Sequence, residues 1–167
     1  MPPKFVCRPK AKAKAKANAI KSVNNVSQLG KALLGYSQDN GNKLPAGARW
    51  CDDILREAQT PKNYVSPQDP SASSLRAETG QNFSSYALNA AVAGKGYFDL
   101  APDTVLIFEC PLGWNGTGGA EDIHRMRSRN PLYGSLQTIA VVMADGSARQ
   151  VRFTEFNGLN WTGQRRR

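Results

Sequence analysis

The feature that most constrains the fold is the stretch of residues 17–36, ANAIKSVNNVSQLGKALLGY. Its apolar residues recur every three or four positions, which is typical of one face of an α-helix. The Asp39-Asn40-Gly41-Asn42 cluster favours a helix end after a run of about 30 Å. We therefore predict one long helix whose buried face carries Ile20, Val23, Val26, Leu29, Leu33 and Tyr36.

The later sequence offers strands for this helix to lie on. Residues 104–110 (TVLIFEC) are β-branched and aromatic, which predicts a central strand, and residues 83–91 predict a shorter one. Residues 138–144 and 148–153 flank Asp145-Gly146 and predict a hairpin with a type I′ turn. The fold class is therefore α+β, with one long N-terminal helix packed across an antiparallel sheet and long loops. We expect Leu29 and Leu33 to be buried against strand residues Val105, Ile107, Val141 or Met143.

The remaining segments divide the chain into one domain and two tails. Residues 50–58 predict a short helix, residues 61–79 a long surface loop, residues 113–119 a glycine-rich loop, and residues 121–130 either a loop or a short helix. Residues 1–16 are a basic flexible tail or an extension of the long helix, residues 17–160 form the domain, and residues 161–167 are a basic C-terminal tail.

The basic residues are concentrated in these tails. Residues 1–23 hold seven Lys/Arg and no acid, and Arg165 to Arg167 add three more. The remaining residues hold twelve Lys/Arg and all thirteen Asp/Glu, so their charges nearly cancel. The net charge of +9 therefore says little about the folded surface. The tails do favour an alternative function, in which a soluble domain uses them to bind nucleic acid or anionic surfaces with strong salt dependence. The longest apolar run has six residues, far fewer than the roughly eighteen of a membrane helix.

Three cysteines occur without C-x-x-C spacing, which argues against a zinc site. Cys7 lies in the N-terminal tail. Cys51 and Cys110 form a disulfide if the protein matures in an oxidising compartment, and remain buried thiols if it stays in a reducing one. The sequence is compatible with both outcomes.

Residues with catalytic chemistry are scattered. The single histidine, His124, stands beside Glu121 and Asp122 and is expected to be a solvated surface group. Asp52 and Asp53 are adjacent, so they point to different sides of a helix. Asn115-Gly116-Thr117 matches a glycosylation sequon, a pattern that is common by chance. We predict no catalytic, metal or cofactor site, and an enzyme is the weakest of the three functions considered.

The helical stretch and its surroundings resemble a known family. The run KAKAKANAIKSVNNVSQLGKALLGYSQDNGNKLP is similar to the segment that follows the membrane helix in bacterial type IV prepilin-like and type II secretion pseudopilin-like proteins. It is most similar to the large prepilin-type family of planctomycetes and verrucomicrobia. The matching residues are Ser22, Asn24, Asn25, Gln28, Leu29, Gly30, Tyr36, Asp39, Asn40, Leu44 and Pro45.

Further matches follow in the family's order. Residues 85–89 (SYALN) resemble its Ser-Tyr-x-x-Asn strand, residues 102–109 (PDTVLIFE) resemble its next strand, and residues 142–148 resemble its closing hairpin with Asp145 and Gly146. The resemblance covers roughly residues 10–155. It implies a structural, non-enzymatic subunit of a pilus or secretion-associated assembly at the cell envelope, whose partners are other pilin-like or secretion-system subunits.

Two departures from the family accompany this resemblance. The family's histidine upstream of the Asp-Gly pair is replaced by Ser135, so any role of that histidine is lost. The family's processing site and hydrophobic helix do not appear, and MPPKFVCRP stands in their place. These departures are expected of a truncated or mis-started reading frame or of a soluble relative, and we favour truncation. As written, the chain is expected to be a cytoplasmic monomer without a membrane span.

Overall fold

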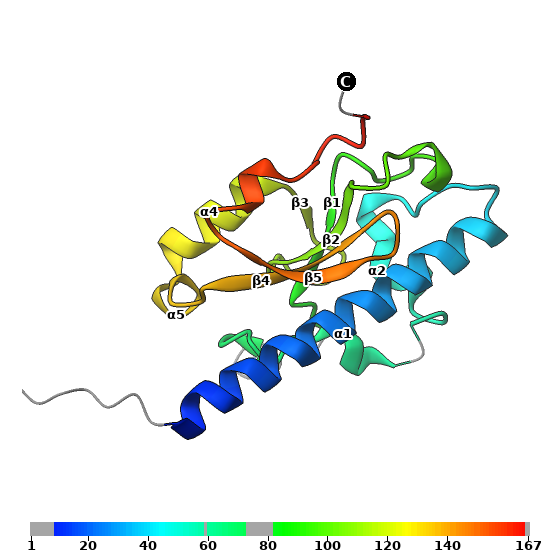
Figure 1. Cartoon of the computed structure of the whole chain (residues 1–167). Coiled ribbons are helices and arrows are strands. Elements are labelled where there is room, and N and C mark those ends of the chain that lie inside the picture. Colours follow the sequence, from blue (N-terminus) through cyan, green and yellow to red (C-terminus); the bar gives the residue numbers. More distant parts are fainter. Residues whose placement is uncertain (1–8, 59, 73–81, 166–167) are drawn as a thin grey trace, which may run out of the picture.

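Helix α1 (Pro9–Asp39) runs obliquely along one side of the sheet (Figure 1) in a computed structural model that describes residues 9–58, 60–72 and 82–165. Its 31 residues correspond to about 46 Å. Residues 10–17 of the Lys-Ala repeat continue the helix, and their side chains are all exposed. The helix ends where expected, because Gly41 and Asn42 adopt positive φ angles of 63° and 69°. Cys7 and the rest of residues 1–8 lie outside the described residues.

The sheet has five strands in the order β3-β1-β2-β4-β5. These strands are β1 (Tyr86–Asn89), β2 (Val105–Glu109), β3 (Thr117–Gly118), β4 (Thr138–Met143) and β5 (Ala148–Arg152). The predicted central strand is confirmed, since β2 pairs antiparallel with both β1 and β4. The sheet is mixed rather than purely antiparallel, because β3 runs parallel to β1. The predicted α+β fold with one long N-terminal helix is confirmed.

Shorter helices surround these strands. They are α2 (Trp50–Ile54), α4 (Ala120–Arg129) and α5 (Pro131–Gly134), with 3-10 turns η1 (Gly47–Arg49), η2 (Pro61–Tyr64), η3 (Tyr97–Asp99) and η4 (Phe156–Gly158). Residues 121–130, for which the sequence is compatible with a loop or a short helix, are largely helical. The short helix predicted for residues 50–58 ends earlier, at Ile54.

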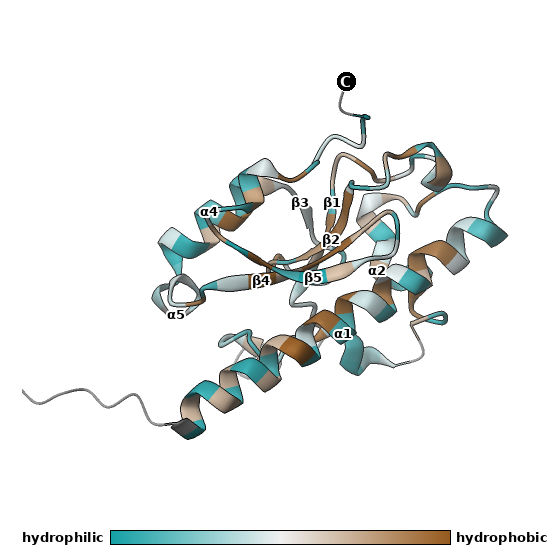
Figure 2. Cartoon of the chain, in the orientation of Figure 1, coloured by the Kyte–Doolittle hydropathy of each residue, from teal (hydrophilic) through white to brown (hydrophobic). Residues whose placement is uncertain are grey.

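The buried face of α1 differs from the predicted one at its N-terminal end. Val26, Leu29 and Leu33 are fully buried, whereas Val23 and Tyr36 are only partly buried. Ile20 is 54% exposed, so its assignment to this face is wrong. At 100° per residue, Ile20 lies about 120° around the helix from Val26, because repeated steps of three residues drift off a straight stripe. The middle of α1 is hydrophobic and its N-terminal turns carry hydrophilic bands (Figure 2).

Two clusters of buried residues lie on opposite faces of the sheet. Leu88, Ile107 and Val142 belong to the cluster that packs with α1, and Ala87, Phe108 and Val141 to the other. This division follows from the alternation of side chains along each strand. Among the strand partners predicted for Leu29 and Leu33, Ile107 is therefore correct. Val105, Val141 and Met143 belong to the cluster on the other face.

A change of register between Val105 and Ile107 separates these two residues onto different faces. Val105 joins the cluster remote from α1, together with Met143, its partner on β4. Leu106 and Ile107 both join the cluster beside α1. Such a bulge sets two residues of one strand against one of its partner. It allows β2 to present both side chains to the long helix.

The predicted β4–β5 hairpin is present, but its turn is not type I′. A type I′ turn needs positive φ at both central residues, and here Gly146 (φ 83°) has one whereas Asp145 does not. The Gly146 N–H donates to Met143 O at 2.9 Å, and the Met143 N–H donates to Ser147 O at 2.8 Å. Residues 144–146 thus form a three-residue loop that ends in a left-handed glycine.

Three segments predicted as surface loop or tail contribute to the folded body. Tyr64 in residues 61–79 is fully buried, while residues 73–79 lie outside the described residues. Thr117 and Gly118 in residues 113–119 form β3. In the C-terminal tail, Trp161 O accepts a hydrogen bond from Asn89 Nδ2 at 2.9 Å, and Gly163 O accepts one from the Ala101 N–H at 3.1 Å. Packing therefore continues beyond residue 160.

Candidate functional site

One side of α1 carries polar residues that bind a neighbouring chain segment. Asn18 Nδ2 donates to Pro67 O at 3.1 Å, and Asn25 Nδ2 donates to Val65 O at 3.0 Å. Between these two asparagines, one helical turn from each, lies the fully buried Ser22. The backbone carbonyls of residues 65 and 67 thus receive donors from the helix, which fixes this segment against α1. The family-like Asn25 is therefore not a free surface residue, whereas its neighbour Asn24 is exposed.

Ser22 begins a chain of buried hydroxyl groups. Its Oγ lies 3.0 Å from Tyr86 Oη and 3.2 Å from Ser66 Oγ. Ser66 Oγ in turn donates to Glu109 Oε1. Ser66 Oγ is thus placed to donate either to Ser22 Oγ or to Glu109 Oε1, and because a hydroxyl carries one proton it serves one of them at a time. The four residues come from β1, α1, the 65–72 segment and β2.

Glu109 is the acidic end of this network, and it is fully buried. Its second carboxyl oxygen, Oε2, accepts hydrogen bonds from Gln68 Nε2 and from the Ala140 N–H, both at 3.0 Å. Burial raises the pKa of Glu109 from 4.5 to about 7, although the bonds from Ser66 and Ala140 act in the opposite direction. Burial likewise raises the pKa of Tyr86, and the nearby carboxyl of Glu109 adds to this effect. We call Ser22, Ser66, Tyr86 and Glu109 the carboxyl network.

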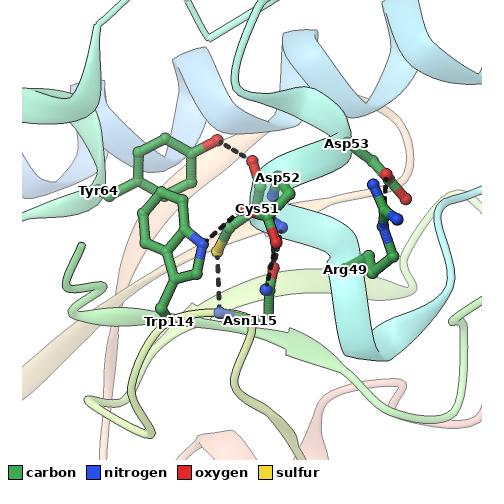
Figure 3. Close-up of polar contacts among 7 residues, drawn as sticks. All are labelled: Arg49, Cys51, Asp52, Asp53, Tyr64, Trp114 and Asn115. Atoms are coloured by element: carbon green, nitrogen blue, oxygen red, sulfur yellow. Dashed lines mark hydrogen bonds and ion pairs between the residues drawn. The ribbon is translucent and has the colours of Figure 1, made fainter. Parts of the chain in front are cut away.

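A second polar cluster joins α2 to the loop that precedes β3 (Figure 3). Asn115 has a positive φ of 59°, and its Oδ1 accepts from the backbone N–H of Cys51 at 2.8 Å and of Asp52 at 3.3 Å. These are N–H groups at the start of a helix, which lack partners inside the helix. Asn115 therefore acts as an N-cap supplied from a distant part of the chain.

Asp52 completes this cap. Its two carboxyl oxygens accept from Trp114 Nε1 at 2.8 Å and from Asn115 Nδ2 at 2.6 Å, and these bonds, Asn115 first, lower the pKa of Asp52. Asp53 points elsewhere and pairs with Arg49 at 3.4 Å, as the adjacent positions predicted (Figure 3). Both ends of the sequon asparagine's amide group are thus engaged within the protein.

The two candidate disulfide cysteines are not bonded to each other. Cys51 and Cys110 are both buried free thiols, in the clusters on opposite faces of the sheet. Of the two outcomes that the sequence leaves open, the structure has the pair of buried thiols, and the sheet separates them. Cys51 Sγ accepts the Asn115 N–H at 3.3 Å. Burial raises the pKa of each thiol to about 12, which keeps both protonated and unreactive near neutral pH.

The remaining chemical candidates are spread over the surface. His124 is exposed, with its Nε2 3.3 Å from Asn157 Oδ1 and its ring 4.8 Å from that of Phe156. Asp145 Oδ1 accepts from the N–H and Oγ of Ser147, at 2.8 and 2.6 Å, which stabilises the hairpin turn itself. Across residues 9–58, 60–72 and 82–165, no group of three or more His, Cys, Asp or Glu side chains is placed to hold a metal ion.

Sequence reasoning missed the carboxyl network. One signal was present: Glu109 is the only charged residue in TVLIFEC, and Tyr86 and Ser22 both belong to the family-like motifs. A charged residue inside an otherwise apolar strand is buried only if it is paired or hydrogen-bonded. Its partner Ser66, however, lies in a segment with no periodic pattern, so the pairing could not be found without the fold.

Comparisons with models of known protein families, with curated proteins and with solved structures gave no match. Within the described part of the chain, no helix combines the length and the apolar character that crossing a membrane requires. The geometry of the chain's own residues therefore carries the functional argument.

Proposed function

We propose that this protein is a structural, non-enzymatic subunit of a pilin-like or pseudopilin-like assembly at the cell envelope, where its partners are other subunits of that kind. The observation that carries the proposal is the division of α1 into two parts. Its C-terminal two thirds pack on the sheet, while residues 10–17 extend the same helix with every side chain exposed. Because the exposed and the buried parts belong to one continuous helix, an anchor or a neighbouring subunit bound to the exposed part would be held in a fixed position relative to the sheet.

The residues that resemble the prepilin-type family support this proposal through their contacts. Ser22, Tyr86 and Glu109 come from three separate matching segments and meet in the carboxyl network. Gly30, from the first segment, faces Val142 of the closing hairpin: a Cβ at Gly30 would lie 2.8 Å from Val142 Cγ2. The matching segments thus form one packed unit, as expected if the resemblance extends to the fold.

The proposal is tested by supplying an anchor. A prepilin leader and apolar helix are placed directly before Ala11, and the fusion is expressed in a bacterium that has prepilin peptidase. We expect membrane fractionation to place the fusion in the inner membrane, and intact-mass analysis to show that the leader is removed. A matched fusion with the leader's cleavage-site glycine altered should stay uncleaved. An unaltered fusion that remains in the soluble fraction, or uncleaved at the membrane, contradicts the proposal.

The rival function, binding to nucleic acid through basic tails, has one favourable observation. Lys10, Lys12, Lys14 and Lys16 all lie exposed on a regular helix, as two pairs on opposite sides of it. Replacing these four lysines by glutamine separates the two functions. The rival predicts salt-sensitive DNA binding by the unaltered chain that the substitution removes, whereas the pilin-like proposal predicts no measurable DNA binding by either protein at physiological salt. Fluorescence anisotropy with labelled duplexes measures the difference.

A further inference from the structure

A surface cavity of about 340 Å³ lies at the open end of the β4–β5 hairpin, beside the last turn of α4. Thr138, the first residue of β4, and Arg152, the last residue of β5, are register partners at this open end. The lining contains two arginines, three neutral polar residues and one aromatic ring, and none of its residues is acidic. These residues, named here the arginine cavity, are Arg127, Gln137, Thr138, Arg152, Phe153 and Thr154.

Arg127 is held in a fixed orientation at this cavity. Its guanidinium carbon lies 3.6 Å from the centre of the Phe153 ring, and its Nη2 donates to Gly134 O at 3.2 Å. A guanidinium held over a ring by a cation–π contact retains N–H donors for other acceptors. The hydrogen bond to Gly134 O uses only one of its nitrogens. Arg127 therefore offers pre-positioned donors, with little side-chain entropy left to lose on binding.

Arg152 supplies the second positive charge. Its nearest acidic partner is Glu155, at 3.9 Å, and the Arg152 side chain in this pair is 75% exposed. Such a long, solvent-exposed pair is weak and easily exchanged. The hydroxyl groups of Thr138 and Thr154 make no hydrogen bond to other described residues, which leaves them as additional neutral donors at the same place.

We propose that the arginine cavity binds the oxyanion group, phosphate or carboxylate, of a small molecule. Two arginines line the cavity without an acidic residue in the lining, and arginine N–H groups bind both phosphate and carboxylate. The volume lies at the lower end of the roughly 300–1,000 Å³ range of small-molecule sites. Phe153, 9% exposed, provides an apolar edge beside the charges for the ligand's organic part. This inference does not depend on the pilin-like function.

The test follows backbone amide signals of the full chain by NMR at pH 7 and low salt during titration with inorganic phosphate, phenyl phosphate and acetate. We expect saturable shifts confined to residues near 127, 137–138 and 152–154. Saturation by the phosphates alone, or by acetate as well, identifies the preferred oxyanion. Phenyl phosphate binding more tightly than inorganic phosphate locates the organic part against Phe153.

Arg152→Gln is the decisive variant, because its exposed side chain is not needed for folding. Arg149→Gln is the matched control: it removes the same charge from the same strand, but Arg149 lines a different cavity, near the hairpin turn. We expect Arg152→Gln to weaken binding at least tenfold and Arg149→Gln to change it less than twofold. Equal weakening by both variants would indicate only a diffuse positive field and overturn the proposal. So would shifts that do not saturate with any of the three anions.

Discussion

The two faces of the sheet are buried by different means. On the face remote from α1, Phe108, Phe156 and their neighbours form an apolar cluster, covered partly by Ile123 of α4. On the face toward α1, the apolar cluster continues into the carboxyl network. Apolar contacts are stable at any pH, whereas a buried carboxyl group must remain hydrogen-bonded and is sensitive to its protonation. One sheet thus has an apolar core on one face and, on the other, a core that includes a buried, hydrogen-bonded carboxyl group.

The largest expected effect is on the face remote from α1. Phe108 is fully buried and its ring meets that of Trp161 edge to face at 5.1 Å. Phe108→Ala should lower the free energy of unfolding by about 3–5 kcal/mol, because it removes an aromatic ring from a packed core. Urea unfolding measures the loss. The control is Phe98→Ala, since Phe98 is 64% exposed and its loss should cost less than about 0.5 kcal/mol. Similar losses for both would mean that Phe108 is not a core residue.

Leu33→Ala makes the matching test on the face toward α1. Leu33 is fully buried in the cluster that joins α1 to the sheet, so we expect a loss of about 2–5 kcal/mol. Ile20→Ala, on the same helix, should cost less than about 0.5 kcal/mol, because Ile20 is exposed. Thermal melting of both variants decides the point. If Leu33→Ala melts like the parent chain, α1 does not pack through this stripe.

The pH dependence of stability separates the two faces. Glu109 has a pKa of about 7 when folded and an ordinary value of 4.5 when unfolded. Between these values the folded state holds a proton that the unfolded state has released, so stability should fall as the pH rises from 4.5 to 7 and then level off. The loss is on the order of 3 kcal/mol.

Urea unfolding at pH 5 and pH 8 measures this loss. Glu109→Gln cannot titrate and should remove the contribution, whatever its effect on absolute stability. Glu155→Gln serves as the control, because the Glu155 side chain is 53% exposed and should leave the dependence unchanged. An identical pH dependence in the parent chain and Glu109→Gln would exclude Glu109 as its source.

The smallest expected effects concern two glycines of α1, and they have opposite signs. A Cβ at Gly30 would lie 2.8 Å from the Cγ2 of the fully buried Val142, so Gly30→Ala should destabilise by about 1–3 kcal/mol. At Gly35 the nearest atom is Glu57 Cγ at 3.8 Å, so Gly35→Ala should stabilise by up to about 1 kcal/mol through helix propensity. Differential scanning calorimetry compares them. Stabilisation by both would mean that α1 has room to move from β4.

The sequence predicted the long helix, the central strand and the hairpin, because each has a strong local pattern. It failed where a residue's role depends on distant partners. Ser22 and Gly30 belong to the buried face of α1 yet are polar or small, so apolar periodicity passes over them. Ile20 fits the spacing but lies off the stripe. Cys51 and Cys110 were candidates for a bridge because spacing alone could not assign them to opposite faces of the sheet.

The carboxyl network could not be predicted from the sequence for a related reason. Its donor Ser66 and its acceptor Glu109 are 43 residues apart, and the segment around Ser66 has no regular structure. The cap of α2 by Asn115 likewise joins residues 64 apart. Contacts of this kind depend on the completed fold, so residue type and local spacing give no information about the partner.

The position of α1 in the chain sets the order in which the protein can fold on the ribosome. Gln150 of β5 donates to Ala19 O at 2.9 Å, which closes a contact between residues 131 apart. The helix is thus synthesised long before β4 and β5, and the cluster that buries Leu29 and Leu33 is complete only when Ala140 and Val142 of β4 have been added. Contacts so distant along the chain slow folding and prolong the exposure of apolar surface. The contacts that join α1 to β4 and β5 can therefore form only after the final hairpin has been translated.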